Sequence, residues 1–264
     1  SKCMEPGRKR IKYWQWLPIL VFWLLVWQLA YILIDSDLLL ASPLQVGVRL
    51  IVLVGESHFW LTAGLSILRI TAGFLLGVVI GVVLAVLTVR IRLMWLLLRP
   101  VIVAIRATPI ASFIILALVW MTKARVVIFI VLLMVVPIVW ANMVEGIRKT
   151  DPQLLEMAQI FGLTSSQVLR LIYLPSISPF FLAAVTTALG LGWKAGIAAE
   201  VLSTPQPSLG SELYNAKIYL ETPNLLAYTL VIIVLSLILE KLLLWVLNRA
   251  ESYFKTHGRQ GNAS

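Results

Sequence analysis

The sequence predicts an all-α polytopic membrane protein with about six transmembrane helices. Of its 264 residues, 60% are hydrophobic and only 13% are charged. A soluble domain of this length would carry about 25% charged residues. Apolar runs long enough to cross a bilayer as helices recur along the chain. The single cysteine, Cys3, excludes a disulfide framework and a cysteine-based metal site.

Six apolar runs are the expected spanning helices. They are Leu17–Ile34, Leu61–Val89, Pro100–Met121, Val126–Ile147, Pro179–Ala199 and Pro223–Leu247. Residues 17–247 therefore form one predicted transmembrane domain, with tails at 1–16 and 248–264. The third run is interrupted by Pro109. A further amphipathic stretch, Leu44–Val54, is expected to lie along the outer membrane interface.

Basic residues predict which ends of the helices face the cytoplasm. Lys and Arg are concentrated before the first run and in every second connection, and the segments expected outside hold only Arg49, Lys123, Arg125 and Lys217. Because basic residues stay on the cytoplasmic side, both tails and residues 151–175 are expected there. The net charge of +10 then indicates loops that face anionic lipid, and no nucleic-acid partner is expected.

Between the fourth and fifth runs, two short helices joined by a hinge are predicted. Asp151, followed by proline, is a favourable helix start. Gly162 supplies a stop, because glycine adopts the left-handed conformation without penalty. Thr164 has Gln167 three residues later, which is the spacing of a capping box, so a second helix is expected to begin there and to end before Pro175.

The first of these short helices has a surface typical of a docking element. Its polar side chains, Gln153, Glu156 and Gln159, recur every three residues and form one narrow stripe. The residues between them are apolar. A helix this apolar, yet too short to cross a bilayer, must bury most of its surface against protein.

The segment 151–175 resembles the EAA loop of the integral-membrane subunits of ABC importers. That pattern is Glu-Ala-Ala, three residues, Gly, nine residues and Ile-x-Leu-Pro. The matching residues here are Glu156, Ala158, Gly162, Ile172, Leu174 and Pro175. Met157 replaces the first alanine and keeps the position apolar. We call residues 151–175 the EAA-like segment.

The resemblance extends over roughly Leu44–Leu247, to permeases of the nitrate, sulfonate, taurine and bicarbonate group. The shared stretches outside the loop are Ser42-Pro43, Ser66-Ile67-Leu68-Arg69, Ala72-Gly73-Phe74 with Gly77, Arg99-Pro100, Arg106, Pro109 and Ala111.

Several partners are implied by this resemblance. A separate ABC ATPase dimer would bind ATP and Mg and receive the EAA-like segment in a groove, with Glu156 facing a basic residue of that partner; a solvated Glu156 is the alternative. A second permease copy would complete the pathway, as a homodimer or with a similar chain. An external solute-binding protein would deliver a small anion such as a sulfonate, taurine, nitrate or bicarbonate, or else a thiamine precursor or other small nutrient.

Charged residues at membrane depth are costly and usually face protein or water. Lys194 lies in the glycine-rich part of the fifth run, which borders the pathway in the family. The pathway candidates are therefore Gly192, Trp193, Lys194, Gly196 and Arg106. Alternatively, Lys194 pairs with Glu200 or extends toward the interface, and Arg106 and Arg69 are structural.

Gly73, Gly77 and Gly81 place small residues on one face of the second run. Such a stripe permits close helix packing, either between two copies or inside one chain.

No catalytic or metal site is expected, and no cofactor of the chain's own. Gly190–Lys194 lacks the spacing and the hydroxyl residue of a phosphate-binding loop. A stand-alone secondary transporter would need internally placed ion-coupling carboxylates and normally a repeat. A membrane scaffold would not explain the charged, glycine-rich fifth run.

Overall fold

The computed structural model describes residues 16–260, and every regular element in that range is helical. The elements are α1 (Trp16–Ile34), α2 (Pro43–Gly55), α3 (Ser57–Arg90), α4 (Arg92–Ala107), α5 (Ile110–Trp120), α6 (Lys123–Arg148), α7 (Pro152–Ile160), α8 (Ser165–Val168), the π-helical turn η2 (Leu169–Tyr173), α9 (Leu174–Ser203), α10 (Leu209–Ile218) and α11 (Thr222–Gln260). The expected tail 1–16 lies outside the described residues apart from Trp16.

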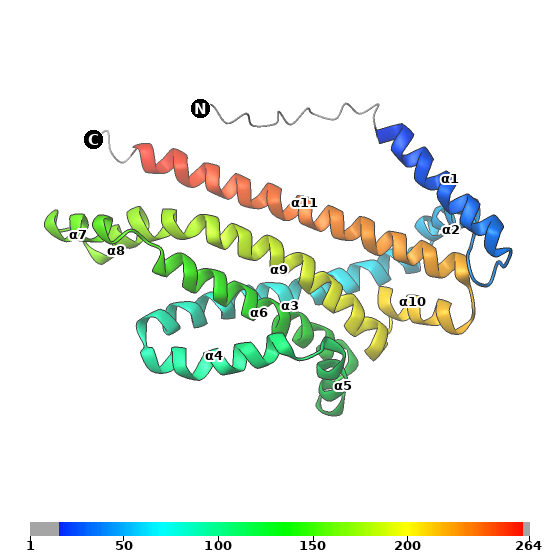
Figure 1. The fold of residues 1–264 in the computed structure, drawn as a ribbon, viewed down its shortest axis with the longest axis horizontal. Coiled ribbons are helices and arrows are strands. Elements are labelled where there is room, and N and C mark those ends of the chain that lie inside the picture. The colour runs from blue at the N-terminus through cyan, green and yellow to red at the C-terminus, as the bar shows by residue number, and fades with distance from the viewer. Residues whose placement is uncertain (1–15, 261–264) are drawn as a thin grey trace.

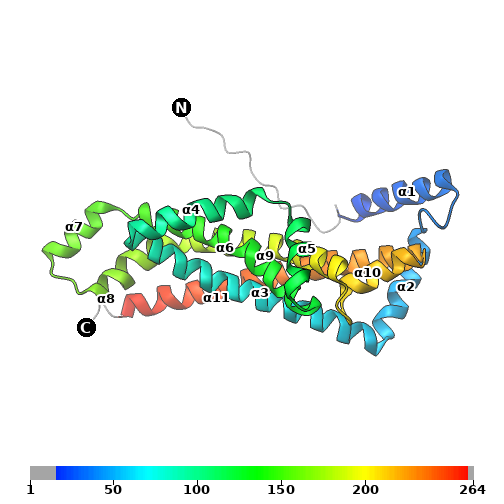
Figure 2. The same cartoon turned by 90° about the horizontal axis from the view of Figure 1, so that it is seen from below.

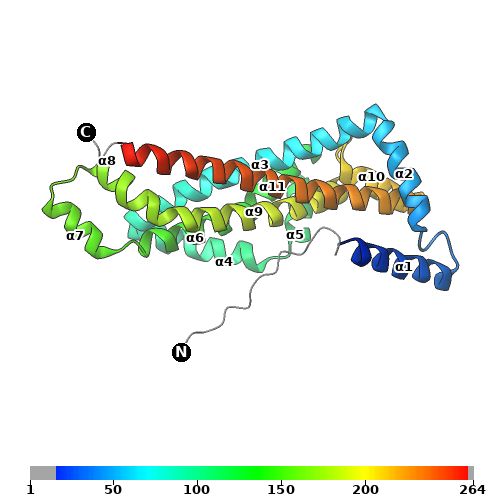
Figure 3. The ribbon, with the colours of Figure 1, turned by 90° about the horizontal axis from the view of Figure 1, so that it is seen from above.

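Long helices form an elongated bundle in which α6 packs against both α3 and α9. Helix α11 runs beside α9 (Figure 1 and Figure 3). Among the described residues, five helices are long and apolar enough to cross a membrane, or six if the bent pair α4 and α5 counts as one span. The predicted all-α polytopic fold is confirmed.

The two ends of the bundle carry different short helices. Helices α7 and α8 lie at one end, which we call the α7 end, while α2 and α10 lie at the other, the α10 end (Figure 1 and Figure 2). Helix α1 lies to the side of the α10 end, where the Trp27 indole N–H donates to the carbonyl of Ala41 just before α2. Its surface is almost entirely exposed.

The glycine stripe of α3 faces α6 inside the same chain. A Cβ placed on Gly77 would lie 2.7 Å from Val135 Cβ, and one on Gly81 would lie 2.8 Å from Val139 Cβ. Only glycine lets the two backbones approach this closely. Of the two alternatives for the stripe, the structure supports packing within one chain.

The third predicted span is broken in two. Helices α4 and α5 meet at an angle of 106°, with extended backbone at Thr108 and Pro109 between them. Proline has no N–H to continue the helix and disfavours helical backbone at the preceding residue. The interruption predicted at Pro109 is confirmed, and it divides the run into two separate helices. Helix α4 begins at Arg92, before the predicted start of this run at Pro100, and only Ile91 separates it from α3.

The EAA-like segment does not stop before Pro175. The helical backbone continues through that proline into α9, so the expected break there was wrong. In the π-turn η2, the Leu174 N–H donates to the Leu169 carbonyl, five residues back rather than four. This wider turn lies next to the proline, which cannot donate a hydrogen bond of its own.

The connection Glu200–Thr222 contains a helix that we did not predict. Ser208 caps α10, since its hydroxyl accepts from the Ser211 N–H at 3.0 Å. By contrast, the predicted amphipathic stretch forms the helix α2, which begins with a capping box between Ser42 and Gln45. Helix α11 continues beyond Leu247 to Gln260.

Candidate functional site

The hinge of the EAA-like segment has the local structure predicted for it. The Asp151 carboxylate accepts from the Gln153 N–H at 2.9 Å at the start of α7. Gly162 has a φ of +63°, in the left-handed region that favours glycine. The Leu163 N–H then donates to the Ala158 carbonyl at 2.9 Å, which closes the end of α7.

Helix α7 lies at one end of the bundle in Figure 1, and it leaves large apolar side chains uncovered there. Met157 is 52% exposed, Ile160 82% and Phe161 73%, whereas Ala158 is buried. Glu156 is also exposed and makes no hydrogen bond or ion pair with any residue that the structure describes. A turn that is fixed by its own caps yet exposes its apolar face is suited to docking.

The remaining EAA-like residues lie where the segment enters α9. Ile172 is buried within η2, and Leu174 and Pro175 are exposed at the first positions of α9. The six predicted coupling residues therefore lie on α7, at the Gly162 turn, and on the helical stretch that enters the bundle through η2 and α9.

Lys194 lies in an otherwise apolar hollow of about 320 Å³ between α5, α6 and α9. The hollow is lined by Ile110, Ala111, Ile114, Met134, Ile138, Leu191, Lys194, Ala195, Ala198 and Leu202. The neighbouring Gly192 packs on Val131 and Val135 near the middle of α6, so Lys194 lies deep in the spanning region. Its amine makes no hydrogen bond or ion pair within the described range.

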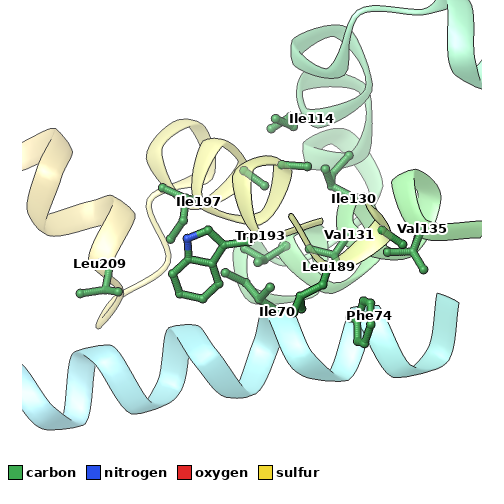
Figure 4. Close-up of a cluster of buried hydrophobic side chains, with 14 of the residues drawn as sticks. Ile70, Phe74, Ile114, Ile130, Val131, Val135, Leu189, Trp193, Ile197 and Leu209 are labelled. Carbon is green, nitrogen blue, oxygen red and sulfur yellow. The ribbon is translucent and has the colours of Figure 1, made fainter. Parts of the chain in front are cut away.

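Gly192, Trp193 and Gly196 do not share this hollow. Residues 192 and 196 occupy the face of α9 opposite Lys194, because residues four apart share a helix face. A Cβ on Gly196 would lie 2.6 Å from Ile70 Cγ1. Figure 4 shows the Trp193 indole among Ile70, Val131 and Leu189, and it is only 2% exposed. These three are core residues of the single chain, a correction to their expected place on a pathway between two chains.

Arg106 is exposed near the end of α4 and is not among the residues that line the Lys194 hollow. Arg69, by contrast, is structural: its Nη1 donates to the Pro207 carbonyl at 2.9 Å and lies 3.6 Å from Glu200 Oε1. Glu200 is thus paired with Arg69, which excludes the alternative in which it pairs with Lys194.

A buried polar cluster at the α10 end was missed by sequence reasoning. Glu200 is completely buried, and its Oε2 accepts from Ser66 Oγ at 2.8 Å and from the Gly210 N–H at 3.1 Å. Ser66 Oγ in turn accepts from the Leu209 N–H at 2.9 Å. We call Ser66, Arg69, Glu200, Pro207, Leu209 and Gly210 the Glu200 cluster. A lone carboxylate in the apolar stretch 195–202 was the available signal for it.

No group of three or more His, Cys, Asp or Glu side chains is close enough to hold a metal ion within residues 16–260. His58 faces Glu212 at 3.5 Å and Thr62 at 3.4 Å, all at the α10 end.

Comparison with known proteins identifies the family. Residues 77–252, two thirds of the chain, match the family "Binding-protein-dependent transport system inner membrane component". The taurine transport system permease protein TauC of Escherichia coli (strain K12) is 27% identical over 225 residues, covering 81% of this chain and 80% of that protein. The putative aliphatic sulfonates transport permease protein SsuC of Bacillus subtilis (strain 168) is 25% identical, covering 84% and 81%.

Two further relatives widen the comparison. The bicarbonate transport system permease protein CmpB of Synechococcus elongatus is 24% identical over 189 residues, covering 71% of this chain and 68% of that protein. A solved structure of an amino acid ABC transporter covers 71% of this chain and 92% of its own, with a TM-score of 0.58 and 18% identity, which supports the fold alone.

The matched span begins within α3, at Gly77, and contains the EAA-like segment and the residues that line the Lys194 hollow. The chain therefore belongs to the family of binding-protein-dependent transport system inner membrane components, as an ABC importer permease of the group that includes taurine, sulfonate and bicarbonate permeases.

Proposed function

We propose that this chain is one of two permease subunits in an ATP-driven importer, and that the EAA-like segment receives the force of a separate ATPase dimer. The observation that carries the proposal is the exposed apolar face of α7 beside the left-handed turn at Gly162. Exposed apolar patches on an otherwise ordered element mark interaction sites. Two copies of the chain would form the pathway between them, and ATP and Mg would bind only to the ATPase.

We propose that the α7 end lies in the cytoplasm and the α10 end outside. Arg90, Arg92, Arg148 and Lys149 lie at or near helix termini on the α7 side, where α3 ends, α4 begins and α6 ends. The excess of basic residues there supports this orientation. The α10 end would then face an external solute-binding protein.

Because Gly192, Trp193 and Gly196 are buried in the core, we propose the Lys194 hollow as the part of the chain that lines the pathway. A lone cation deep in an apolar surface is costly unless it meets water, protein or an anion. In the proposed pair, the two hollows would face a shared pathway and Lys194 would favour a small anion. Relatives named for taurine, aliphatic sulfonates and bicarbonate support that substrate class. Arg106 stays a second, more peripheral candidate.

The first experiment is purification of the chain from its native membrane in mild detergent, followed by mass spectrometry of the proteins that accompany it. We expect an ATPase at equal stoichiometry. A solute-binding protein in the same preparation would give the substrate by analysis of its bound ligand, including a thiamine precursor if that is the cargo. Repeated recovery of the chain alone from several detergents would favour a stand-alone transporter and overturn the proposal.

A charge reversal at Glu156 tests the docking role directly. Glu156→Arg should abolish ATP-dependent uptake in proteoliposomes while the permease remains folded, because the carboxylate would meet a basic residue of the ATPase. Gln153→Arg, which places an arginine one turn away without removing a carboxylate, is the matched control and should have a smaller effect. Uptake unchanged by Glu156→Arg would mean that this carboxylate is only solvated.

A further inference from the structure

Helix α9 connects the two ends of the bundle without a break. It begins at Leu174, at the end of the EAA-like segment, and ends at Ser203, one turn beyond Glu200; Figure 1 shows its path along the bundle. An α-helix rises 1.5 Å per residue, so its 30 residues extend about 45 Å. One continuous helix therefore reaches from the EAA-like segment to the Glu200 cluster.

The Glu200 cluster ties three elements together. Glu200 comes from α9, Ser66 and Arg69 come from α3, and the remaining contacts come from the backbone at the start of α10. Helices α9 and α10 pack closely here, because a side chain on Gly210 would overlap the Glu200 Cβ. Removing the partners of a buried carboxylate strongly destabilises a protein. These contacts therefore stabilise the junction of α3, α9 and α10.

Helix α10 has one face in this contact and one face uncovered. Leu209 and Ala216 are buried against the bundle. Tyr214 is 37% exposed, Ile218 55% and Tyr219 71%. Exposed tyrosine beside an aliphatic side chain is typical of protein-binding surfaces.

We infer that Glu200 is a positioning residue for transport: it locks α10 to α9 and α3, so that movement of the EAA-like segment is transmitted through α9 to the outer surface of α10. This inference rests on the proposed function, in which an ATPase drives the α7 end. Under it, ATP-dependent changes at the ATPase reposition the surface that the solute-binding protein touches.

The test uses the complete complex of permease and ATPase in nanodiscs. Cys3 is replaced by serine, the exposed Lys217 of α10 by cysteine, and the two permease copies carry a spin label at that position. Inter-label distances are measured without nucleotide and after trapping with ATP and vanadate. We expect ATP to shift the distance in the parent complex, and Glu200→Ala to abolish that shift while basal ATPase activity is retained.

Two variants separate positioning from simple loss of structure. Glu200→Gln retains an acceptor for Ser66 and the Gly210 N–H, so it should restore most of the shift. Glu240→Gln makes the same chemical change at an exposed carboxylate of α11 and should leave the shift intact.

Should Glu200→Ala fail to assemble, Ser66→Ala serves in its place, because it removes the hydroxyl that joins Glu200 to the Leu209 N–H. A folded Ser66→Ala complex should show a reduced shift. A full shift in whichever of these two variants assembles would overturn the inference while leaving the proposed function in place. A parent complex that contains no ATPase would overturn the proposed function itself.

Discussion

The two faces of α9 differ in what covers them. The face with Gly192, Trp193 and Gly196 is sealed against α3 and α6 of the same chain. The face with Lys194 opens into an apolar hollow that the described residues leave uncovered. Residues one position apart in sequence thus belong to different environments.

Neighbours in the sequence therefore need not belong to the same site. The glycines and the tryptophan of this stretch pack in the core, while Lys194 faces the hollow. The side chains on the buried face must fit closely against α3 and α6, and this packing stabilises the chain. The residues on the Lys194 face have no such close contacts, so they are available to contact a partner or a substrate. Substitutions on the two faces should therefore separate into changes of stability and changes of transport.

The largest expected loss of stability is from Trp193→Ala. Removing a buried tryptophan leaves a cavity and should lower the free energy of unfolding by about 3–5 kcal/mol. Trp193→Phe should cost much less, because the buried indole N–H has no hydrogen-bond partner within the described range. Thermal denaturation in detergent measures both. Equal stability of the alanine variant and the parent would remove Trp193 from the core.

Gly196→Ala should have the next largest effect. Its new methyl group would meet Ile70 and Val131, and overpacking of this kind costs about 1–3 kcal/mol. Gly190→Ala is the matched control on the same helix, because nothing lies within 4 Å of the added Cβ. The control should be neutral or gain up to about 1 kcal/mol, as alanine favours a helix over glycine. Similar melting temperatures for the two variants would contradict the close packing at residue 196.

Lys194→Met should not lower the free energy of unfolding, because the side chain is exposed and unpaired within residues 16–260 and its charge at membrane depth is costly. Uptake of a small anion by the reconstituted importer should nevertheless fall by roughly tenfold, the effect of losing one charge-assisted hydrogen bond. Lys194→Arg keeps the charge and should retain more uptake. Normal transport by Lys194→Met would remove this residue from the pathway and leave the hollow without a functional role.

Local chemistry was enough to predict several features from sequence. The left-handed turn at Gly162, the cap at Asp151 and the capping box that begins α2 each depend on residues only a few positions apart. The long spans followed from apolar run length, because backbone groups in lipid must be satisfied within a helix. The approximate number of spans followed from the same run lengths, and the resemblance to the family followed from the spacing of residues in the EAA-like segment.

Contacts between segments far apart in the chain could not be predicted from local sequence patterns. The sequence by itself determined the helical membrane fold, the EAA-like segment and its hinge. Only the tertiary structure decided the angle between α4 and α5, the face of α3 that its glycines present to α6, and the partners of Glu200. The physical reason is that Ser66 and Glu200 are 134 residues apart, so their hydrogen bond depends on how the helices pack and not on the pattern within any one of them.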